Sequence, residues 1–108
     1  MRRHDYLDHD IETASPKQIR QCQEAELARQ LDYLFARSLF YQEKFRSAGL
    51  RRKDCCNLRD LARFPFTTKE ELRASQASQP PLGRHIAADW HNVIRVHSSC
   101  LLYTSRCV

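Results

Sequence analysis

The sequence predicts a small, mainly α-helical domain, and three of its features support this fold class. The chain has 108 residues and only two glycines, Gly49 and Gly83, which lie between its periodic segments. A glycine-punctuated β-sandwich is therefore disfavoured. Apolar residues recur at helical spacing over two long stretches. A chain of this length buries only about 60 to 70% of its unfolded surface, so we expect a thin core and marginal stability.

The charge of the chain limits the classes of partner that it suggests. The formal net charge is +5 and the isoelectric point is near 9.2, which would suit an anionic partner. The basic residues are scattered, however, and cluster only at Arg2-Arg3 and Arg51-Arg52-Lys53. Without a nucleic-acid motif, such charge indicates a solvated surface, so we expect no nucleic-acid partner. The sequence shows neither an apolar signal segment nor a bilayer-spanning run, which predicts a cytoplasmic protein without a membrane partner.

The cysteines and histidines do not form a metal-binding pattern. The five cysteines include no Cys-x-x-Cys pair, and no histidine stands at zinc-ligand spacing from them. We therefore predict reduced thiols, with no metal site and no disulfide framework. The five histidines share no helical spacing, so we interpret them as surface or loop residues, with His97 kept as a candidate ligand contact.

The first helix has a clear start after a lead-in, residues 1–14, that we expect to be extended. Ser15 is a suitable N-cap, Pro16 suits the first helical position, and Gln18 completes a capping box. An apolar stripe with helical spacing follows: Leu27, Leu31, Leu34 and Ser38.

A second helix is predicted to end at a glycine. Tyr41, Phe45 and Ala48 recur at i, i+4 and i+7, and Gly49 followed by Leu50 is typical of a left-handed helix end with an apolar contact back to Phe45. The stretch from Arg51 to Cys56 is expected to be a loop.

Two shorter helical segments follow this loop. Asn57 can cap a helical turn that Pro65 stops. Thr67 and Thr68 each have a glutamate three residues on, so a capping box can form in two registers. Lys69 lies in this first turn, where a cation is unfavourable, which suggests a nearby anion, although an exposed lysine tolerates the cost.

The last segments are predicted to be a connector and a strand. From Ala74 to Pro81 the composition turns to Ser, Gln, Ala and Pro, which favours an extended connector. Trp90 is expected to anchor the approach to a strand over residues 92–97.

Five segments, taken in order, resemble the N-terminal part of phenylacetate-coenzyme A ligases. They are Asp10 to Ser15, the pairs Phe40-Tyr41, Lys44-Phe45 and Ala48-Gly49 taken as one segment, Leu58 to Leu61, Phe64 to Arg73 and Val93 to Ser99. The block Phe-Pro-Phe-Thr-Thr-Lys, followed by the strand-like run Val-Ile-Arg-Val-His-Ser-Ser, is the most specific part. The resemblance implies the N-terminal helical microdomain, residues 15–75, of an α/β adenylate-forming ligase. Residues 76–99 would be a connector and one C-terminal strand of the next domain, here without its sheet.

The resemblance also implies a reaction. Enzymes of this family use ATP and Mg²⁺ to activate an aryl acid such as phenylacetate as an acyl adenylate, and the coenzyme A thiol then displaces AMP. They hold the triphosphate with a Ser-Ser-Gly-Thr-Thr-Gly-Lys-Pro-like loop. Ser98 and Ser99 match its first two positions, and with Lys69 they are the candidate cofactor-binding residues. No catalytic or metal-binding residue is assigned, and we expect this chain alone to be inactive.

The sequence departs from the family pattern in several places. The family usually has a proline where Leu39 stands, so a single helix from Pro16 to Ala48 is an alternative. The changed loop after Gly49 and the changed connector, Gln76 to His85, leave the acid substrate open.

The tail, residues 100–108, has neither the glycines nor the lysine of the family loop. It can be back-translated as a transposase recognition end, used in sequencing linkers, joined to its inverted copy. We interpret it as an artefactual tail, with a natural frameshift or a divergent terminus as the alternative.

A different class of function stays open beside the enzyme. The apolar stripes of these helices could pack against a second copy of the chain, which would make it a helical interaction or dimerisation module, with a homodimer as its form.

Overall fold

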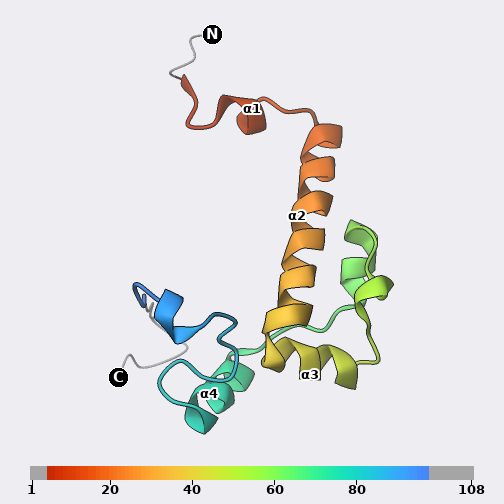
Figure 1. Ribbon diagram of the computed structural model, residues 1–108. Coiled ribbons are helices and arrows are strands. Elements are labelled where there is room, and N and C mark those ends of the chain that lie inside the picture. The colour runs from red at the N-terminus through yellow and green to blue at the C-terminus, as the bar shows by residue number, and fades with distance from the viewer. Residues whose placement is uncertain (1–4, 98–108) are drawn as a thin grey trace.

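The computed structural model describes residues 5–97 and confirms the mainly α-helical prediction. Figure 1 shows α2 as a long central helix, with η2 and η3 beside it, α3 at its end and α4 further along the chain. The elements are α1 (His9–Glu12), α2 (Pro16–Arg37), α3 (Leu39–Ser47), η2 (Arg52–Asp54), η3 (Leu58–Arg63), α4 (Lys69–Ser78) and η4 (Trp90–Asn92).

The start of α2 is the predicted capping box. Ser15 Oγ accepts from the Gln18 backbone N–H at 3.2 Å, and the Gln18 side chain accepts from the Ser15 backbone N–H at 2.9 Å. Both bonds satisfy N–H groups that the first helical turn leaves without an intrahelical partner. The lead-in is not wholly extended, because Asp8 caps the single turn of α1 by accepting from the Ile11 backbone N–H.

The chain breaks between α2 and α3 at Ser38, so the alternative of one long helix is wrong. Ser38 has an extended backbone, with φ −103° and ψ 102°, and it ends α2 and begins α3. Its Oγ accepts from the Tyr41 backbone N–H at 3.2 Å, and its side chain is fully buried. Serine competes with the helix for backbone hydrogen bonds and is a favourable N-cap, which suits Ser38 to a break between two helices. Ser38 is therefore a cap and not a member of the apolar stripe.

The end of α3 confirms the predicted glycine cap. Gly49 has φ +72°, and its N–H donates to the Arg46 carbonyl at 2.9 Å. The Leu50 N–H donates to the Phe45 carbonyl at 2.9 Å. These two bonds are the Schellman arrangement, and they turn Leu50 back onto the core.

The core lies where α2, α3 and the following loop meet. Its buried members are Leu31, Phe45, Leu50 and Cys55. Leu27, Phe35, Tyr41 and Phe64 pack against them. The Phe45 and Phe64 rings are 5.0 Å apart edge to face, a favourable aromatic geometry. The η2–η3 segment returns alongside α2 (Figure 1), and Asn57 caps η3 as predicted, by accepting from the N–H groups of Arg59 and Asp60.

The region after Pro65 agrees with the prediction at its start and differs from it further on. Thr68 caps α4, which is one of the two predicted registers, but α4 continues through Ser78, so residues 74–78 are helical and not an extended connector. Alanine, serine and glutamine are tolerated in a helix, and the chain can stay helical until Pro80 approaches.

The last described residues, 93–97, form no β-ladder, and residues 5–97 contain no strand. A strand is stable only beside a neighbour, and the described part of the chain provides none. Trp90 begins the short η4 and is 55% exposed, so it does not anchor this segment in a core.

Candidate functional site

Of the predicted cofactor-binding residues, Lys69 lies within the part of the chain that the structure describes. Lys69 is the first residue of α4 and is half-buried. His97 is exposed and is the last residue described. Ser98 and Ser99 lie outside the described residues, as does the proposed artefactual tail, so the roles of these serines stay predictions.

The segment that presents Lys69 is fixed to α3 by polar contacts. Tyr41 Oη and Thr67 Oγ1 are 3.0 Å apart and share a hydrogen bond. Lys44 Nζ donates to Glu71 Oε1, and only 12% of the Lys44 side chain is exposed. Glu71 Oε2 accepts from the Thr68 backbone N–H at 2.7 Å, so one carboxylate joins the capping box of α4 to α3.

These contacts set the charge state of Glu71. The hydrogen bond from Lys44 lowers the pKa of the Glu71 carboxyl, and the bond from the Thr68 backbone adds to the effect. Both donors stabilise the ionised form. Glu71 is therefore a carboxylate at neutral pH and is suited to hold a cation in place.

A groove lies between α3 and α4 beside this ion pair. Its polar walls include a second ion pair, in which Arg84 Nη2 donates to Glu43 Oε1 at 2.6 Å. The residues that line it are Phe40, Glu43, Lys44, Ser47, Glu71, Ala74, Ser75, Ser78 and Arg84.

Ser75, at the base of this groove, organises the loop after α4. It is 6% exposed, and its Oγ accepts from the backbone N–H groups of Arg84 at 2.7 Å and His85 at 3.1 Å. His85 Nδ1 lies 2.9 Å from the same oxygen. A hydroxyl oxygen has two acceptor sites, so the Ser75 O–H is left to donate to Nδ1. His85 is thus half-buried and hydrogen-bonded, which sequence spacing did not indicate.

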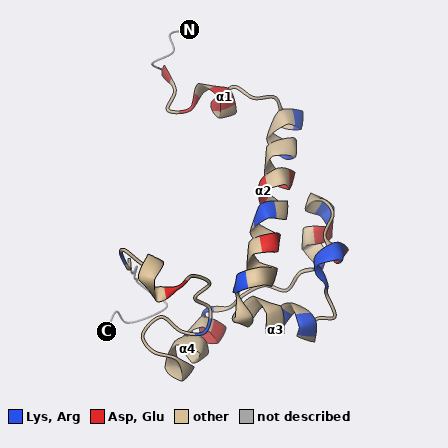
Figure 2. Cartoon of the chain, in the orientation of Figure 1, with Lys and Arg blue, Asp and Glu red and all other residues tan. Residues whose placement is uncertain are grey.

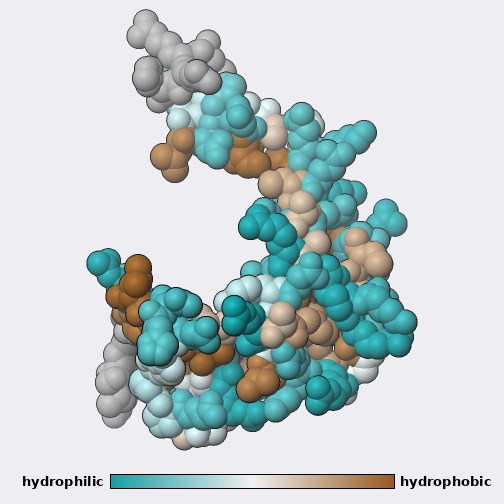
Figure 3. All heavy atoms as spheres, in the orientation of Figure 1, coloured by the Kyte–Doolittle hydropathy of each residue, from teal (hydrophilic) through white to brown (hydrophobic). Residues whose placement is uncertain are grey.

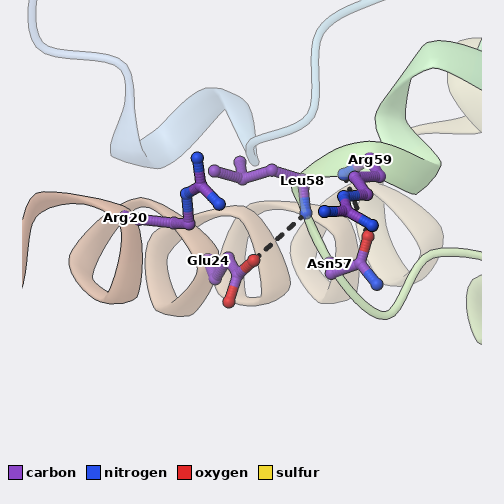
Figure 4. A pocket seen from close by; sticks show the side chains of 5 residues that line it. All are labelled: Arg20, Glu24, Asn57, Leu58 and Arg59. Carbon is purple, nitrogen blue, oxygen red and sulfur yellow. Dashed lines mark hydrogen bonds between the residues drawn. The ribbon is translucent and has the colours of Figure 1, made fainter. Parts of the chain in front are cut away.

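A second depression lies between α2 and η3 and is polar. Figure 4 shows Arg20, Glu24, Asn57, Leu58 and Arg59 around it, with the Leu58 backbone N–H directed to Glu24 Oε1 at 3.5 Å. The Asn57 side chain caps η3, so this depression is lined by a capping residue and by charged surface side chains. Figure 2 shows the wider pattern, with acidic and basic residues interspersed along α2.

Metal-binding and thiol chemistry find little support in residues 5–97. This part of the chain brings together no group of three or more histidine, cysteine or acidic side chains that could hold a metal ion. Cys22 and Cys56 are free and exposed, while burial raises the pKa of the Cys55 thiol and keeps it protonated at neutral pH. In the same residues, no helix is long and apolar enough to cross a membrane.

Sequence reasoning missed the residues that hold α4 in place. Lys44 and Glu71 are 27 positions apart, and Arg84 and Glu43 are 41 apart, so no local spacing links them. The capping box identified Glu71, but only as a partner of Thr68. The one signal for the α3 contact was Lys44 itself, a cation in the last turn of α3.

Comparison with curated proteins gives four similar sequences with the same name. The chain is 33% identical over 89 residues to the phenylacetate-coenzyme A ligase of Escherichia coli and 36% identical over 90 residues to that of Thermus thermophilus. These alignments cover 82% and 83% of this chain and 19% of each relative. The chain therefore spans about a fifth of the length of the curated relatives it matches. No family model matches it.

Comparison with solved structures gives the same class of protein. A 2-hydroxyisobutyryl-CoA ligase in complex with 2-HIB-AMP and CoA superposes with a TM-score of 0.74 at 28% identity, over 79% of this chain and 18% of the other. The same ligase in its postadenylation state gives a TM-score of 0.75 at 26% identity, over 81% of this chain and 18% of the other. The helices of this chain thus take the arrangement found in the N-terminal part of adenylate-forming ligases. Sequence and fold together show that the chain belongs, over the aligned four-fifths of its length, to the phenylacetate-coenzyme A ligase family.

Proposed function

We propose that this chain is the N-terminal portion of an ATP-dependent ligase that joins an aryl acid, phenylacetate or a close analogue, to coenzyme A. The observation that carries the proposal is the 33 to 36% identity to phenylacetate-coenzyme A ligases along four-fifths of the chain. The whole enzyme would use ATP and Mg²⁺ to form an acyl adenylate, which the coenzyme A thiol would convert to the thioester.

We infer that the 108-residue chain itself has no ligase activity. A triphosphate needs several backbone N–H groups and cations around it, which a glycine-rich loop supplies. Only Ser98 and Ser99 match that loop, and residues 100–108 contain no glycine and no lysine. Lys69 and His97 are the other candidates for nucleotide contact, and in the whole enzyme they would need this loop to complete the site.

The activity of the chain can be measured directly. Purified chain is incubated with phenylacetate, ATP, Mg²⁺ and labelled pyrophosphate, and incorporation of label into ATP is followed. We expect no exchange above the blank, with the E. coli ligase as positive control. Exchange at a rate that scales with chain concentration would show that the inference of inactivity is wrong.

The family role can be tested in a chimera. The segment of the E. coli phenylacetate-coenzyme A ligase that aligns with this chain is replaced by this chain's aligned residues. In that chimera Lys69→Ala should raise the KM for ATP if Lys69 faces the nucleotide, while Lys17→Ala, at the exposed start of α2, should leave it unchanged. An unchanged KM for ATP in the Lys69→Ala chimera would remove Lys69 from the site.

A further inference from the structure

We propose that residues 67–85, here called the α4 unit, form a latched body that opens from α3 while the core around α2 stays folded. The unit consists of α4, the threonines before it and the loop that returns to Ser75. Its latch is the set of polar contacts to α3. The proposal concerns the described residues and does not depend on the ligase activity.

The α4 unit is separate from the hydrophobic core. The buried apolar residues and the side chains packed on them belong, within residues 5–97, to α2, α3 and the stretch from Leu50 to Phe64. The buried residue of α4 is Ser75, which is polar. Apolar burial is what makes neighbouring elements unfold together, so α4 lacks the strongest source of cooperativity with α2.

Polar contacts hold the α4 unit on α3. Lys44 pairs with Glu71, Glu43 pairs with Arg84, and Tyr41 bonds Thr67. The Phe40 and His85 rings also approach each other edge-on, with centroids 6.1 Å apart. Ion pairs between partly exposed groups are individually weak and are screened by salt.

Contacts within the α4 unit keep it together as one body. Ser75 accepts from the N–H groups of Arg84 and His85, and the Gly83 N–H donates to the Gln79 carbonyl at 2.7 Å. Gly83 is so close that an added Cβ would lie 2.9 Å from the Gln76 backbone nitrogen and from the His85 ring. The loop is therefore tightly fitted to α4 and would move with it.

The chain on the far side of the α4 unit is also held. Tyr33 Oη donates to the Ala87 carbonyl at 2.5 Å, and Arg37 lies 3.9 Å from Asp89. Both contacts are exposed and come from α2. The unit is thus anchored at both ends, and its release is a local opening between two fixed points and not a loss of the C-terminal half.

Amide hydrogen exchange of the full 108-residue chain, followed by mass spectrometry, tests the latch. Lys44→Met removes the charge and keeps an unbranched apolar stem against Phe40. We expect residues 69–78 to exchange about tenfold faster, because a charge-assisted hydrogen bond is lost. Residues 27–35 of α2 should keep their rate. The matched control is Arg29→Met, which breaks the exposed Glu26–Arg29 pair on α2 and should leave α4 unchanged.

Three results would overturn the proposal. One is an equal acceleration in α2 and α4, which would make them a single cooperative unit. Another is no acceleration in α4. The third is rapid exchange of the α2 amides in the unaltered chain, because there would then be no folded core from which the α4 unit could open. If Lys44→Met does not fold, raising NaCl to about 1 M in the unaltered chain is the second measurement, and it should accelerate α4 selectively through screening.

Discussion

At the scale of single residues, two small polar side chains determine how the helices meet. Ser38 is fully buried and caps α3, and Ser75 is nearly buried and holds the loop after α4. In both cases a hydroxyl satisfies backbone N–H groups that would otherwise be buried without a partner. Such groups cost more to leave unpaired than the bond contributes when it is made. These serines therefore contribute to the fold beyond their small volume.

Ser38→Ala should destabilise the chain by about 1 to 2 kcal/mol, because it removes the cap of α3 and leaves the Tyr41 N–H unsatisfied. Urea unfolding followed by far-UV circular dichroism gives the free energy of unfolding. Ser47→Ala, at an exposed position near the end of the same helix, is the control and should change it by less than about 0.5 kcal/mol. Equal effects of the two substitutions would contradict the role of Ser38.

Alanine substitutions at the two glycines distinguish the cost of backbone strain from the cost of a steric clash. Gly49→Ala places a Cβ in open space at φ +72°, so it should cost about 1 kcal/mol from conformation alone. Gly83→Ala adds a clash with Gln76 and His85 to a similar strain at φ +87°, so it should cost about 2 kcal/mol or more. Unfolding free energies of the two variants decide the order. A Gly49→Ala cost above that of Gly83→Ala would contradict the close packing of the return loop.

At the scale of elements, α4 depends on charges that titrate in acid. The Glu71 pKa is lowered, chiefly by the Lys44 hydrogen bond, so the stabilisation is complete above the ordinary glutamate value of about 4.5. It is lost as the pH falls through the lower folded value. The charged groups that share this groove are Glu43 and Lys44 on α3 and Arg84 after α4.

We therefore expect α4 to detach in acid, as the pH falls below the ordinary glutamate value and through the lowered pKa at which the Glu71 carboxylate becomes protonated. Amide chemical shifts of α4, followed from pH 6 downward, report the detachment. Asp54 also has a lowered pKa, chiefly because the Arg51 backbone N–H donates to it, and its contribution should also be lost as the pH falls through that lowered value. Glu71→Gln, which cannot titrate there, should abolish the acid step in α4 and leave the one near Asp54. If the acid step in α4 persists in Glu71→Gln, a titrating group other than Glu71 causes it.

Local patterns predicted the ends of elements well and their contacts poorly. The Ser15–Gln18 box, the Gly49 cap and the Asn57 cap depend on neighbouring residues, and each was confirmed. The sequence did not decide whether the helix breaks at Ser38, because serine permits a helix end without enforcing one. The extension of α4 to Ser78 was missed because Ser, Gln and Ala suit a connector as well as a helix. The Lys44–Glu71 contact joins elements far apart in sequence, which periodicity cannot reveal.

At the scale of the whole molecule, the chain buries less surface than a compact protein of its size. Its radius of gyration is 17.6 Å, compared with about 13 Å for a globular chain of this length. Large apolar side chains are open to solvent, including Phe66 at 94% and Ile94 at 98% exposed. Figure 3 shows such apolar residues on α1 and near the end of the described chain, on either side of a broad hollow.

This shape agrees with the place of the chain in its family. The relatives are about five times longer than the stretch that aligns, since the alignments cover 19% of their length. Exposed apolar side chains of this size usually mark surfaces that another part of a protein or a partner covers. We infer that the remaining part of a ligase would cover them.

The chimera with the E. coli ligase tests the family role most directly. It replaces the aligned segment of that enzyme with this chain's aligned residues, and formation of phenylacetyl-coenzyme A is measured against the parent enzyme. If these helices are the N-terminal part of such a ligase, the chimera should fold and keep kcat within about tenfold of the parent, because no catalytic residue is predicted within them. A folded chimera that forms no thioester would contradict that assignment.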